Sequence, residues 1–265
     1  MKVYISVDIE GIAGITHWDE AEHDHKAYPQ FQERMTGEAV AACEGAIAAG
    51  ATEIWLKDAH YSGRNILAER LPECVRLIRG WSGHPLGMVQ ELDSSFDAAA
   101  FICYHAAAGT EDNPLAHTLT LKIAEARLNG RRASEFLLYA TAASTLGVPV
   151  VFVSGDEGLQ AHVRQANPRI HTLATSRGVG PSTISVAPAK ARADIKAGVA
   201  AALADDRKAM LLPLANRWTL EVAYSDPVRA YEASHYPGAR LVADRTVRLE
   251  VDDYMDVLRA LRFID

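Results

Sequence analysis

The segment KVYISVDIEG, residues 2–11, decides the fold and contains the first candidate site residues. Its opening part, Lys2–Val7, is rich in β-branched and aromatic side chains and predicts a strand. Asp8 and Glu10 follow two positions apart, so in an extended segment both carboxylates project to the same side. Two carboxylates held that close repel each other unless a proton or a cation lies between them. The segment therefore predicts a strand that ends in a cation site, with Gly11 expected to let the backbone turn away.

The rest of the chain alternates strand-like and helix-like segments, which is typical of α/β proteins. Helices are predicted for residues 31–49, 134–146, 157–165 and 188–203, and strands for residues 52–57, 98–104 and 150–153. Residues 119–128 alternate as one half of a hairpin that closes at Asn129-Gly130. Beyond Pro213 we expect strands 220–224 and 246–251 and helices near residues 227–234 and 254–262. The predicted fold class is α/β, a mainly parallel central sheet flanked by helices with a smaller C-terminal α+β lobe.

Composition narrows the classes of protein that this chain can belong to. It has 265 residues, 49% hydrophobic and 23% charged, and a net charge of -7, as in an ordinary globular enzyme. Lys and Arg are not clustered, so a nucleic-acid partner is not expected. No apolar run reaches about 18 residues and no signal-peptide core is present, so we expect no membrane partner and a cytoplasmic location. The three cysteines, Cys43, Cys74 and Cys103, are expected to be buried free thiols.

Acidic and imidazole side chains follow four of the predicted strands. Open α/β sheets bind ligands beyond the carboxyl ends of their strands, so these side chains are expected to converge. A mixture of His and carboxylate is a common zinc-binding set. Ser134 is a plausible N-cap for the helix that contains Glu135, which adds a further carboxylate. The residues in question are Asp8-Ile9-Glu10, Asp58-Ala59-His60, Tyr104-His105 and Gly155-Asp156-Glu157.

Each of these residues, taken alone, also has an ordinary structural explanation. Asp8 could cap a turn, and a single histidine such as His60 is more often structural than a ligand. Tyr104-His105 could be a satisfied pair in the core, and Glu135 is favoured by the helix dipole whatever its function. The joint occurrence of Asp8, Glu10, His60, His105 and Glu135 favours the metal site over these separate explanations.

The long segment from residue 11 to about residue 28 has no clear regular structure. A loop of this length in a compact domain is usually functional or flexible. His17, His23 and His25 could line the mouth of the site, although a solvated loop is the favoured interpretation. Trp18 could form a wall for the substrate or pack on a neighbouring subunit.

These motifs together resemble the bacterial dinuclear-zinc D-aminopeptidase family, of the dipeptide-transport-operon type. Residues 6–11 resemble its Ser-Val-Asp-x-Glu-Gly signature, and residues 35–39 resemble its first helix. The likeness covers about residues 1–200, and four flanking positions differ from the family at Ala59, Cys103, Ala116 and Ser134. The corresponding motifs here are Asp58-Ala59-His60, Cys103-Tyr104-His105-Ala106, Ala116-His117, Ser134-Glu135 and Gly155-Asp156.

The resemblance implies two zinc ions per subunit, with Asp8 as the bridging ligand. Glu10 and His60 would complete one site, and His105 and Glu135 the other. Three carboxylates and one hydroxide would balance the charge of the two ions, and a zinc pair lowers the pKa of bound water. His117 falls at the family's catalytic histidine, where an imidazole moves a proton or stabilises an oxyanion. Its alternative is a histidine of a surface loop, because residues 111–114 before it predict a turn.

The implied function is a zinc-dependent aminopeptidase that hydrolyses short peptides with a free N-terminus, containing D-amino acids, by a metal-activated hydroxide. The resemblance also implies a ring-shaped homo-oligomer, a decamer, that admits only small peptide substrates. Residues 1–210 would be the metal-binding catalytic domain and residues 211–265 the smaller lobe, unless the chain is one domain. Two alternatives stay open. One is a dinuclear-zinc amidohydrolase or esterase that acts on L-peptides or another small amide. The other is a non-enzymatic, metal-stabilised binding module, against which the absence of cysteine ligands argues.

Overall fold

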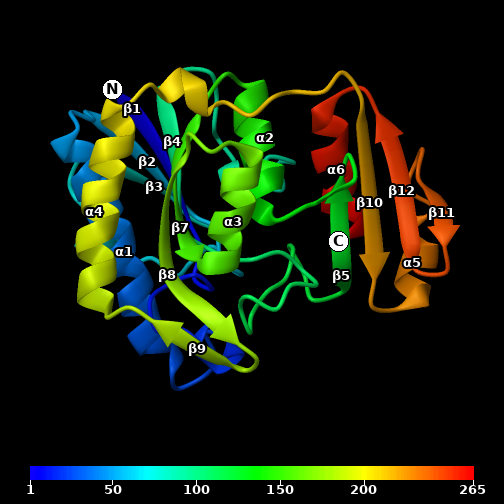
Figure 1. The fold of residues 1–265 in the computed structure, drawn as a ribbon, viewed down its shortest axis with the longest axis horizontal. Coiled ribbons are helices and arrows are strands. Elements are labelled where there is room, and N and C mark those ends of the chain that lie inside the picture. Colours follow the sequence, from blue (N-terminus) through cyan, green and yellow to red (C-terminus); the bar gives the residue numbers. More distant parts are fainter.

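The computed structural model, which describes residues 1–265, has β1 near the middle of a seven-stranded sheet (Figure 1). All neighbouring strands are parallel except the edge pair β8–β9. Strands β1, β4 and β7 are almost wholly buried because helices cover both faces of the sheet. The order of the strands is β3 (Val75–Ile78), β2 (Glu53–Asp58), β1 (Lys2–Val7), β4 (Ala98–Tyr104), β7 (Val150–Asp156), β8 (His171–Val179) and β9 (Ser182–Ser185).

Two layers of helices enclose this sheet, as Figure 1 shows. Helices α1 (Tyr28–Ala48) and α4 (Pro188–Ala204) cover one face, and α2 (Glu135–Thr145) and α3 (Glu157–Ala166) cover the other. The hydroxyl of Ser134 accepts a hydrogen bond from the Leu137 amide at 3.2 Å, so the predicted N-cap of α2 is confirmed. This cap places Glu135 in the first turn of α2, beside the carboxyl ends of β1 and β4.

A second, antiparallel sheet forms the smaller lobe. Its strands lie in the order β11 (Arg240–Ala243), β12 (Thr246–Val251), β10 (Trp218–Tyr224), β5 (Ile123–Leu128) and β6 (Arg131–Arg132). The β5–β6 hairpin closes at Asn129-Gly130 as predicted, and both residues have the positive φ that this turn requires, 49° and 77°. Because β5 and β6 precede residue 210, residues 211–265 do not form this sheet alone, and the proposed domain division stays a prediction.

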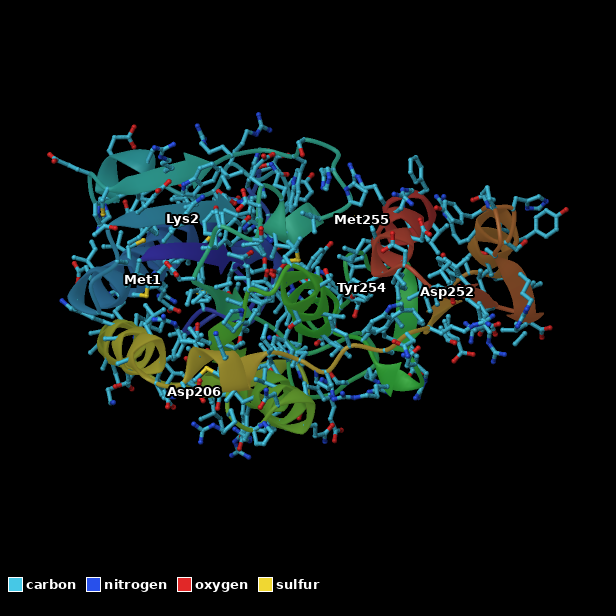
Figure 2. The ribbon with its side chains drawn as sticks, turned by 90° about the horizontal axis from the view of Figure 1, so that it is seen from above. Met1, Lys2, Asp206, Asp252, Tyr254 and Met255 are labelled. Carbon is cyan, nitrogen blue, oxygen red and sulfur yellow. The ribbon has the colours of Figure 1, made fainter.

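The lobe is attached to the main sheet through α6 (Tyr254–Ile264), which packs between α2 and strands β10 and β12 (Figure 1). Tyr254 lies at this junction (Figure 2), where its hydroxyl donates a hydrogen bond to the Leu138 carbonyl at 2.6 Å. Its ring also packs edge-on against Trp218, with 4.7 Å between centroids. These contacts fix the end of α6 close to α2. The remaining short helices are α5 (Pro227–Ala233), η1 (Trp18–Glu20), η2 (Ala68–Arg70), η3 (Gly87–Val89) and η4 (Arg207–Met210).

The predicted α/β class with a mainly parallel sheet is confirmed, with several local differences. Strands β3, β8, β9 and β11 were not expected: β3, β9 and β11 are only four residues long, and β8 is largely polar and half-exposed. The expectation of buried thiols is correct for Cys43 and Cys103 and wrong for Cys74, which is exposed beside the edge strand β3. No helix in the structure combines the length and the apolar character needed to cross a membrane.

Candidate metal centre

Three strand ends and the start of α2 bring the five candidate ligands into one buried cluster. Asp8 and Glu10 follow β1, His60 follows β2, His105 follows β4, and Glu135 opens α2. Each of these residues is at most 7% exposed. Charged groups are rarely buried to this extent unless they are paired or bind a metal.

Asp8 lies in the middle of the cluster, with one carboxylate oxygen toward each of two histidines. Its Oδ1 is 3.4 Å from His60 Nδ1 and its Oδ2 is 3.5 Å from His105 Nε2. Glu10 Oε1 lies 3.2 Å from the same His60 nitrogen, and Glu135 Oε2 lies 3.3 Å from the same His105 nitrogen. The cluster therefore consists of two histidine–carboxylate pairs with the Asp8 carboxylate between them.

Backbone carbonyls determine which nitrogen of each imidazole faces the carboxylates. His60 Nε2 donates to the Ala21 carbonyl at 3.0 Å, and His105 Nδ1 donates to the Ala106 carbonyl at 2.9 Å. Each ring then directs the lone pair of its other nitrogen into the cluster, the arrangement common for metal-ligating histidines. A lone pair that faces a carboxylate is repulsive unless a proton or a cation intervenes.

Two buried polar atoms of the cluster, Glu10 Oε2 and His105 Nε2, have no hydrogen-bond partner. An unsatisfied buried polar atom costs about 1–3 kcal/mol, and more when the group is charged. Imidazole nitrogen and carboxylate oxygen are donors that zinc accepts, and the cluster has no cysteine, so it differs from most closed structural zinc sites. The donor set and the two unpartnered atoms fit a bound zinc centre.

The titration of the cluster reflects the close approach of acids and imidazoles. Burial and the nearby Glu10 charge raise the pKa of Asp8 well above its ordinary value. Burial also opposes ionisation of Glu10, but His60 outweighs it and holds the pKa of Glu10 well below its usual range. Burial disfavours the imidazolium of His105, yet Glu135 and Asp8 raise the pKa of His105 well above normal. Without a cation, the cluster therefore retains protons, which metal binding would displace.

His117 lies at the edge of the cluster, with 13% of its side chain exposed. Its ring stacks on His105 with 4.3 Å between centroids, and its Nε2 is 3.7 Å from Glu135 Oε1. Its Nδ1 donates to the Leu115 carbonyl at 2.9 Å, which leaves the Nε2 lone pair facing the site. Burial and the adjacent His105 lower the pKa of His117, so the ring is neutral near pH 7. The Trp18 ring packs edge-on against it at 5.3 Å.

The potential ligand atoms form two overlapping groups within 4.8 Å. One consists of Asp8, Glu10 and His105, and the other of His105, His117 and Glu135. His117 is therefore close enough to the cluster to act either as a ligand or as a proton-transfer group.

Two glycines, Gly11 and Gly155, pack directly against the backbone that precedes His105. A Cβ atom at Gly11 or at Gly155 would lie 1.9 Å from the Tyr104 carbonyl oxygen, so neither position has space for a side chain. The Gly11 amide donates to the Cys103 carbonyl at 2.8 Å, and the Thr175 hydroxyl is within 2.7 Å and 3.0 Å of the Gly11 and Gly155 carbonyls. The backbone turns at Gly11 as expected, but its φ is not in the left-handed region, so the close approach to Tyr104 rather than conformational freedom explains the glycine.

Asn113 supports the site and was missed in the sequence, where residues 111–114 indicated only a turn. Its side-chain amide donates to the Glu10 carbonyl at 3.0 Å and to Asp156 Oδ2 at 3.1 Å. Asp156 also accepts from the Ala106 amide at 2.7 Å, next to His105. Asp156 therefore supports the loop after β4 and does not face the cluster. Asp58 has a similar role, accepting from the Ile66 amide at 2.7 Å in the loop after His60.

Two adjoining cavities border the cluster. The first, of about 300 Å³, is lined by Asp8, Ala59, His60, Tyr61, Trp81, Met88, His117, Leu119, Glu135, Tyr139, Arg262 and Asp265. The second, of about 620 Å³, is bounded by residues of the 18–24 and 117–122 segments and shares His60, Tyr61, His117 and Leu119 with the first. Of the loop histidines, only His23 lines this second cavity, and it pairs with Asp24 at 2.9 Å.

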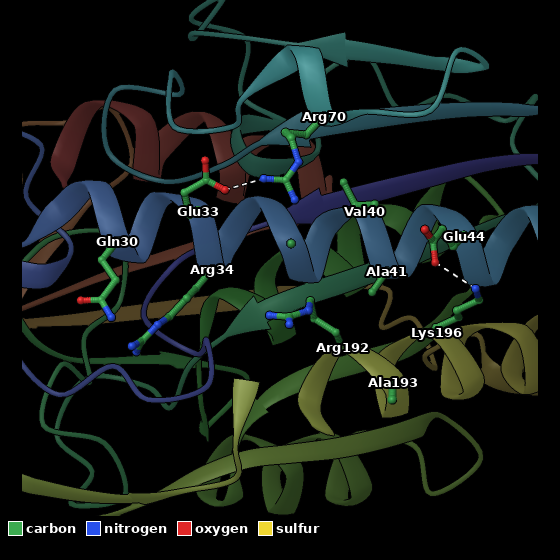
Figure 3. Close-up of a pocket in the computed structure, with 11 residues that line it drawn as sticks. Gln30, Glu33, Arg34, Val40, Ala41, Glu44, Arg70, Arg192, Ala193 and Lys196 are labelled. Carbon is green, nitrogen blue, oxygen red and sulfur yellow. Dashed lines mark hydrogen bonds and ion pairs between the residues drawn. The ribbon is translucent and has the colours of Figure 1, made fainter. Parts of the chain in front are cut away.

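A separate groove lies between α1 and α4 (Figure 3) and contains none of the candidate site residues. Its volume is about 600 Å³, and two ion pairs lie along it: Glu44–Lys196 joins α1 to α4, and Glu33–Arg70 joins α1 to η2. The chemistry of the cluster does not extend into this groove.

Comparisons with known proteins give matches over the whole chain. The model of the D-aminopeptidase family matches residues 1–263. A D-aminopeptidase from Bacillus subtilis (strain 168) is 29% identical over 263 residues, which cover 98% of this chain and 95% of that protein. The solved structure of the Zn-dependent D-aminopeptidase DppA from Bacillus subtilis, described as a self-compartmentalizing protease, has a TM-score of 0.94 at 28% identity. That match covers 100% of this chain and 96% of DppA, so the likeness includes both sheets.

Proposed function

The chain belongs to the D-aminopeptidase family, and on that premise we propose that it is a zinc-dependent aminopeptidase acting on short peptides with a free N-terminus and D-amino-acid residues. The observation that carries the proposal is the buried cluster in which Asp8 lies between two histidine–carboxylate pairs. Two of its buried atoms, Glu10 Oε2 and His105 Nε2, have no hydrogen-bond partner. The names of the matching D-aminopeptidases support the same reaction.

We propose that the cluster holds two zinc ions with Asp8 shared between them. Glu10 and His60 would be the remaining ligands of one ion, and His105 and Glu135 those of the other. The two oxygens of Asp8, each 3.4–3.5 Å from a different imidazole, support this division. Bound zinc would supply a Lewis acid for the amide carbonyl and a water of lowered pKa.

We propose that His117 is the residue that transfers protons in the reaction. Its Nε2 is unprotonated near pH 7, because burial and His105 lower its pKa, and it faces Glu135 at 3.7 Å. It can therefore accept a proton from water and return it to the leaving amine as the amide bond breaks. The Trp18 ring packed against it restricts solvent on the outer side of the imidazole.

The proposal extends to the assembly, a ring-shaped homo-oligomer with ten subunits. The description of DppA as a self-compartmentalizing protease supports an oligomer. Exposed apolar side chains on α5 and α6, Val228, Tyr231 and Phe263, are 59%, 63% and 74% exposed and suit a contact between subunits. Native mass spectrometry or sedimentation velocity tests the number, and a monomer at micromolar concentration would contradict it.

The zinc proposal is tested by stripping the protein with a chelator, titrating zinc and measuring bound metal. We expect about two zinc ions per chain, and a fall to about one or fewer in His60→Ala. His23→Ala is the matched control, because His23 lines the neighbouring cavity and pairs with Asp24, whereas His60 pairs with the proposed ligands Asp8 and Glu10. Less than one zinc per chain in the wild type, or hydrolysis retained by His60→Ala, would contradict the proposal.

Substrate chirality and the role of His117 need separate measurements. Hydrolysis of D-Ala-D-Ala and L-Ala-L-Ala by the zinc-loaded protein distinguishes the D-aminopeptidase from an L-peptidase of the same chemistry. Zinc binding with no hydrolysis of either would favour a structural metal module. His117→Ala is expected to keep its zinc and to lose about 10²–10⁴-fold in kcat. A loss of zinc in that variant would instead make His117 a ligand.

A further inference from the structure

We infer that Arg262 binds the free carboxylate of the peptide substrate, so that the enzyme selects peptides whose carboxyl terminus lies one or two residues beyond the cleaved bond. The inference rests on the proposed function and assigns the far end of the substrate. It concerns the cavity of about 300 Å³ that Asp8, His60, His117 and Glu135 line on one side.

Arg262 is the single lysine or arginine among the residues that line this cavity. It comes from α6 of the smaller lobe, which Tyr254 fastens to α2 at the Leu138 carbonyl. The cavity therefore has a cluster of carboxylates from the main sheet at one part and a guanidinium from the lobe at another. A short peptide is complementary to this arrangement, because it has an ammonium group at one end and a carboxylate at the other.

The guanidinium of Arg262 is free to accept an anion. Arg259, one turn earlier on α6, forms an ion pair with Asp256, whereas Arg262 forms neither an ion pair nor a side-chain hydrogen bond. Asp265 is the acid beside it; desolvation raises the pKa of Asp265, while Arg262 and Lys122 act against this shift. Asp265 lies beside Arg262 on the cavity wall but forms no ion pair with it, so this neighbour does not occupy the guanidinium. A guanidinium whose N–H groups have no partner suits a carboxylate, because it can donate two parallel hydrogen bonds to the two carboxylate oxygens.

The size of the cavity suits a short ligand. An extended residue spans about 3.3–3.6 Å, so two or three residues reach about 7–11 Å. A cavity of about 300 Å³ has room for a peptide of that length. Tyr61, Trp81 and Tyr139 also line it and offer aromatic surface for small side chains. A longer peptide would place its carboxylate beyond Arg262.

The experiment compares a free dipeptide with its C-terminal amide, D-Ala-D-Ala and D-Ala-D-Ala-amide, in the zinc-loaded enzyme. The amide keeps the scissile bond and the free amine and removes only the negative charge. We expect the wild type to prefer the free acid by about tenfold in kcat/KM, mainly through KM. In Arg262→Gln the acid and the amide should be hydrolysed equally, with the rate for the amide within about twofold of wild type. Arg262→Lys should recover part of the preference.

Arg259→Gln is the matched control, because Arg259 is on the same helix and does not line the cavity. It should keep the full preference of the wild type. Equal rates for acid and amide in the wild type, or an equal loss for both substrates in Arg262→Gln, would overturn the inference.

Calorimetric binding keeps the inference testable if the proposed hydrolysis fails. The probe is a dipeptide analogue in which a methyleneamine replaces the amide, used as the free acid and as the carboxamide. The wild type should bind the acid about tenfold more tightly, and Arg262→Gln should bind both equally. Absence of hydrolysis together with this difference would reject the aminopeptidase and retain the carboxylate site; equal binding of acid and carboxamide by the wild type would reject the site.

Discussion

Glu38→Gln is expected to remove a pH dependence of the free energy of unfolding that arises from the buried Glu38 carboxyl group, next to the metal centre. The Glu38 side chain is fully buried on α1, where its Oε1 accepts from the Ala13 amide at 2.9 Å and its Oε2 accepts from the Cys103 thiol at 3.1 Å. Burial raises the pKa of Glu38 from 4.5 to about 7, although Arg192 and Arg34 act in the opposite direction. Glutamine has the same shape and carries no charge, so it separates the charge from the packing.

The sign and the size of the effect follow from the difference between the folded and unfolded pKa. Between pH 4.5 and pH 7 the folded protein holds a proton on Glu38 that the unfolded chain has released, so the free energy of unfolding falls as the pH rises. A shift of about 2.5 pKa units corresponds to about 3 kcal/mol at about 1.4 kcal/mol per unit. The wild type should therefore lose about 3 kcal/mol relative to Glu38→Gln between about pH 4.5 and pH 8.

The measurement is urea unfolding of both proteins at a series of pH values, at one protein concentration and with excess chelator. Other titrating groups, including the metal ligands, contribute the same slope to both proteins and cancel in the difference. The difference should rise toward higher pH and level off above about pH 7. A difference that stays constant from pH 4.5 to pH 8 would refute the reasoning, because Glu38 would then titrate alike in the folded and unfolded chains.

Substitutions at three further positions test the backbone and the walls of the site. Gly11→Ala places a Cβ 1.9 Å from the Tyr104 carbonyl oxygen, so the free energy of unfolding in urea should fall by about 1–3 kcal/mol and zinc should bind more weakly. A variant as stable as the wild type would contradict this, because the backbone would then have moved without cost. Cys103 has φ +63°, a conformation that favours glycine, so Cys103→Gly should be more stable than Cys103→Ala by about 1 kcal/mol. Within regular structure alanine is usually the more stabilising of the two, and finding that order here would argue against backbone strain at Cys103. Lys57 donates to the Gly80 carbonyl at 2.8 Å and lies 3.9 Å from the Trp81 ring centroid, so Lys57→Met should raise KM severalfold and leave zinc content unchanged. A change in kcat alone would contradict that positioning role.

Much of the candidate site could be predicted from the sequence because its residues lie at strand ends. The carboxyl end of a strand such as β1 is a local property, visible in the apolar run that stops before Asp8. The same holds for His60 after β2 and His105 after β4, so their convergence followed from the sheet alone. The N-cap at Ser134 is equally local, and it positioned Glu135.

Other features depend on contacts between distant segments and could not be predicted. Strand β8 is half-exposed at the side of the sheet, so its residues show no apolar run. Asn113 supports the backbone of Glu10, a hundred residues earlier in the chain, through a hydrogen bond of 3.0 Å. Arg262 reaches the cavity because α6 packs against α2 across two lobes.

The sequence by itself determined the kinds of atom in the centre: three carboxylates and two imidazoles, without cysteine. The tertiary structure decided their relation. It set Asp8 between the two histidine–carboxylate pairs and used the carbonyls of Ala21 and Ala106 to turn the two imidazole lone pairs inward. It also brought a cation from the smaller lobe to the same cavity. The physical reason is the sequence separation of the interactions. Side-chain direction and strand ends depend on neighbouring residues, whereas packing brings together segments that are far apart in the sequence and that no local pattern connects.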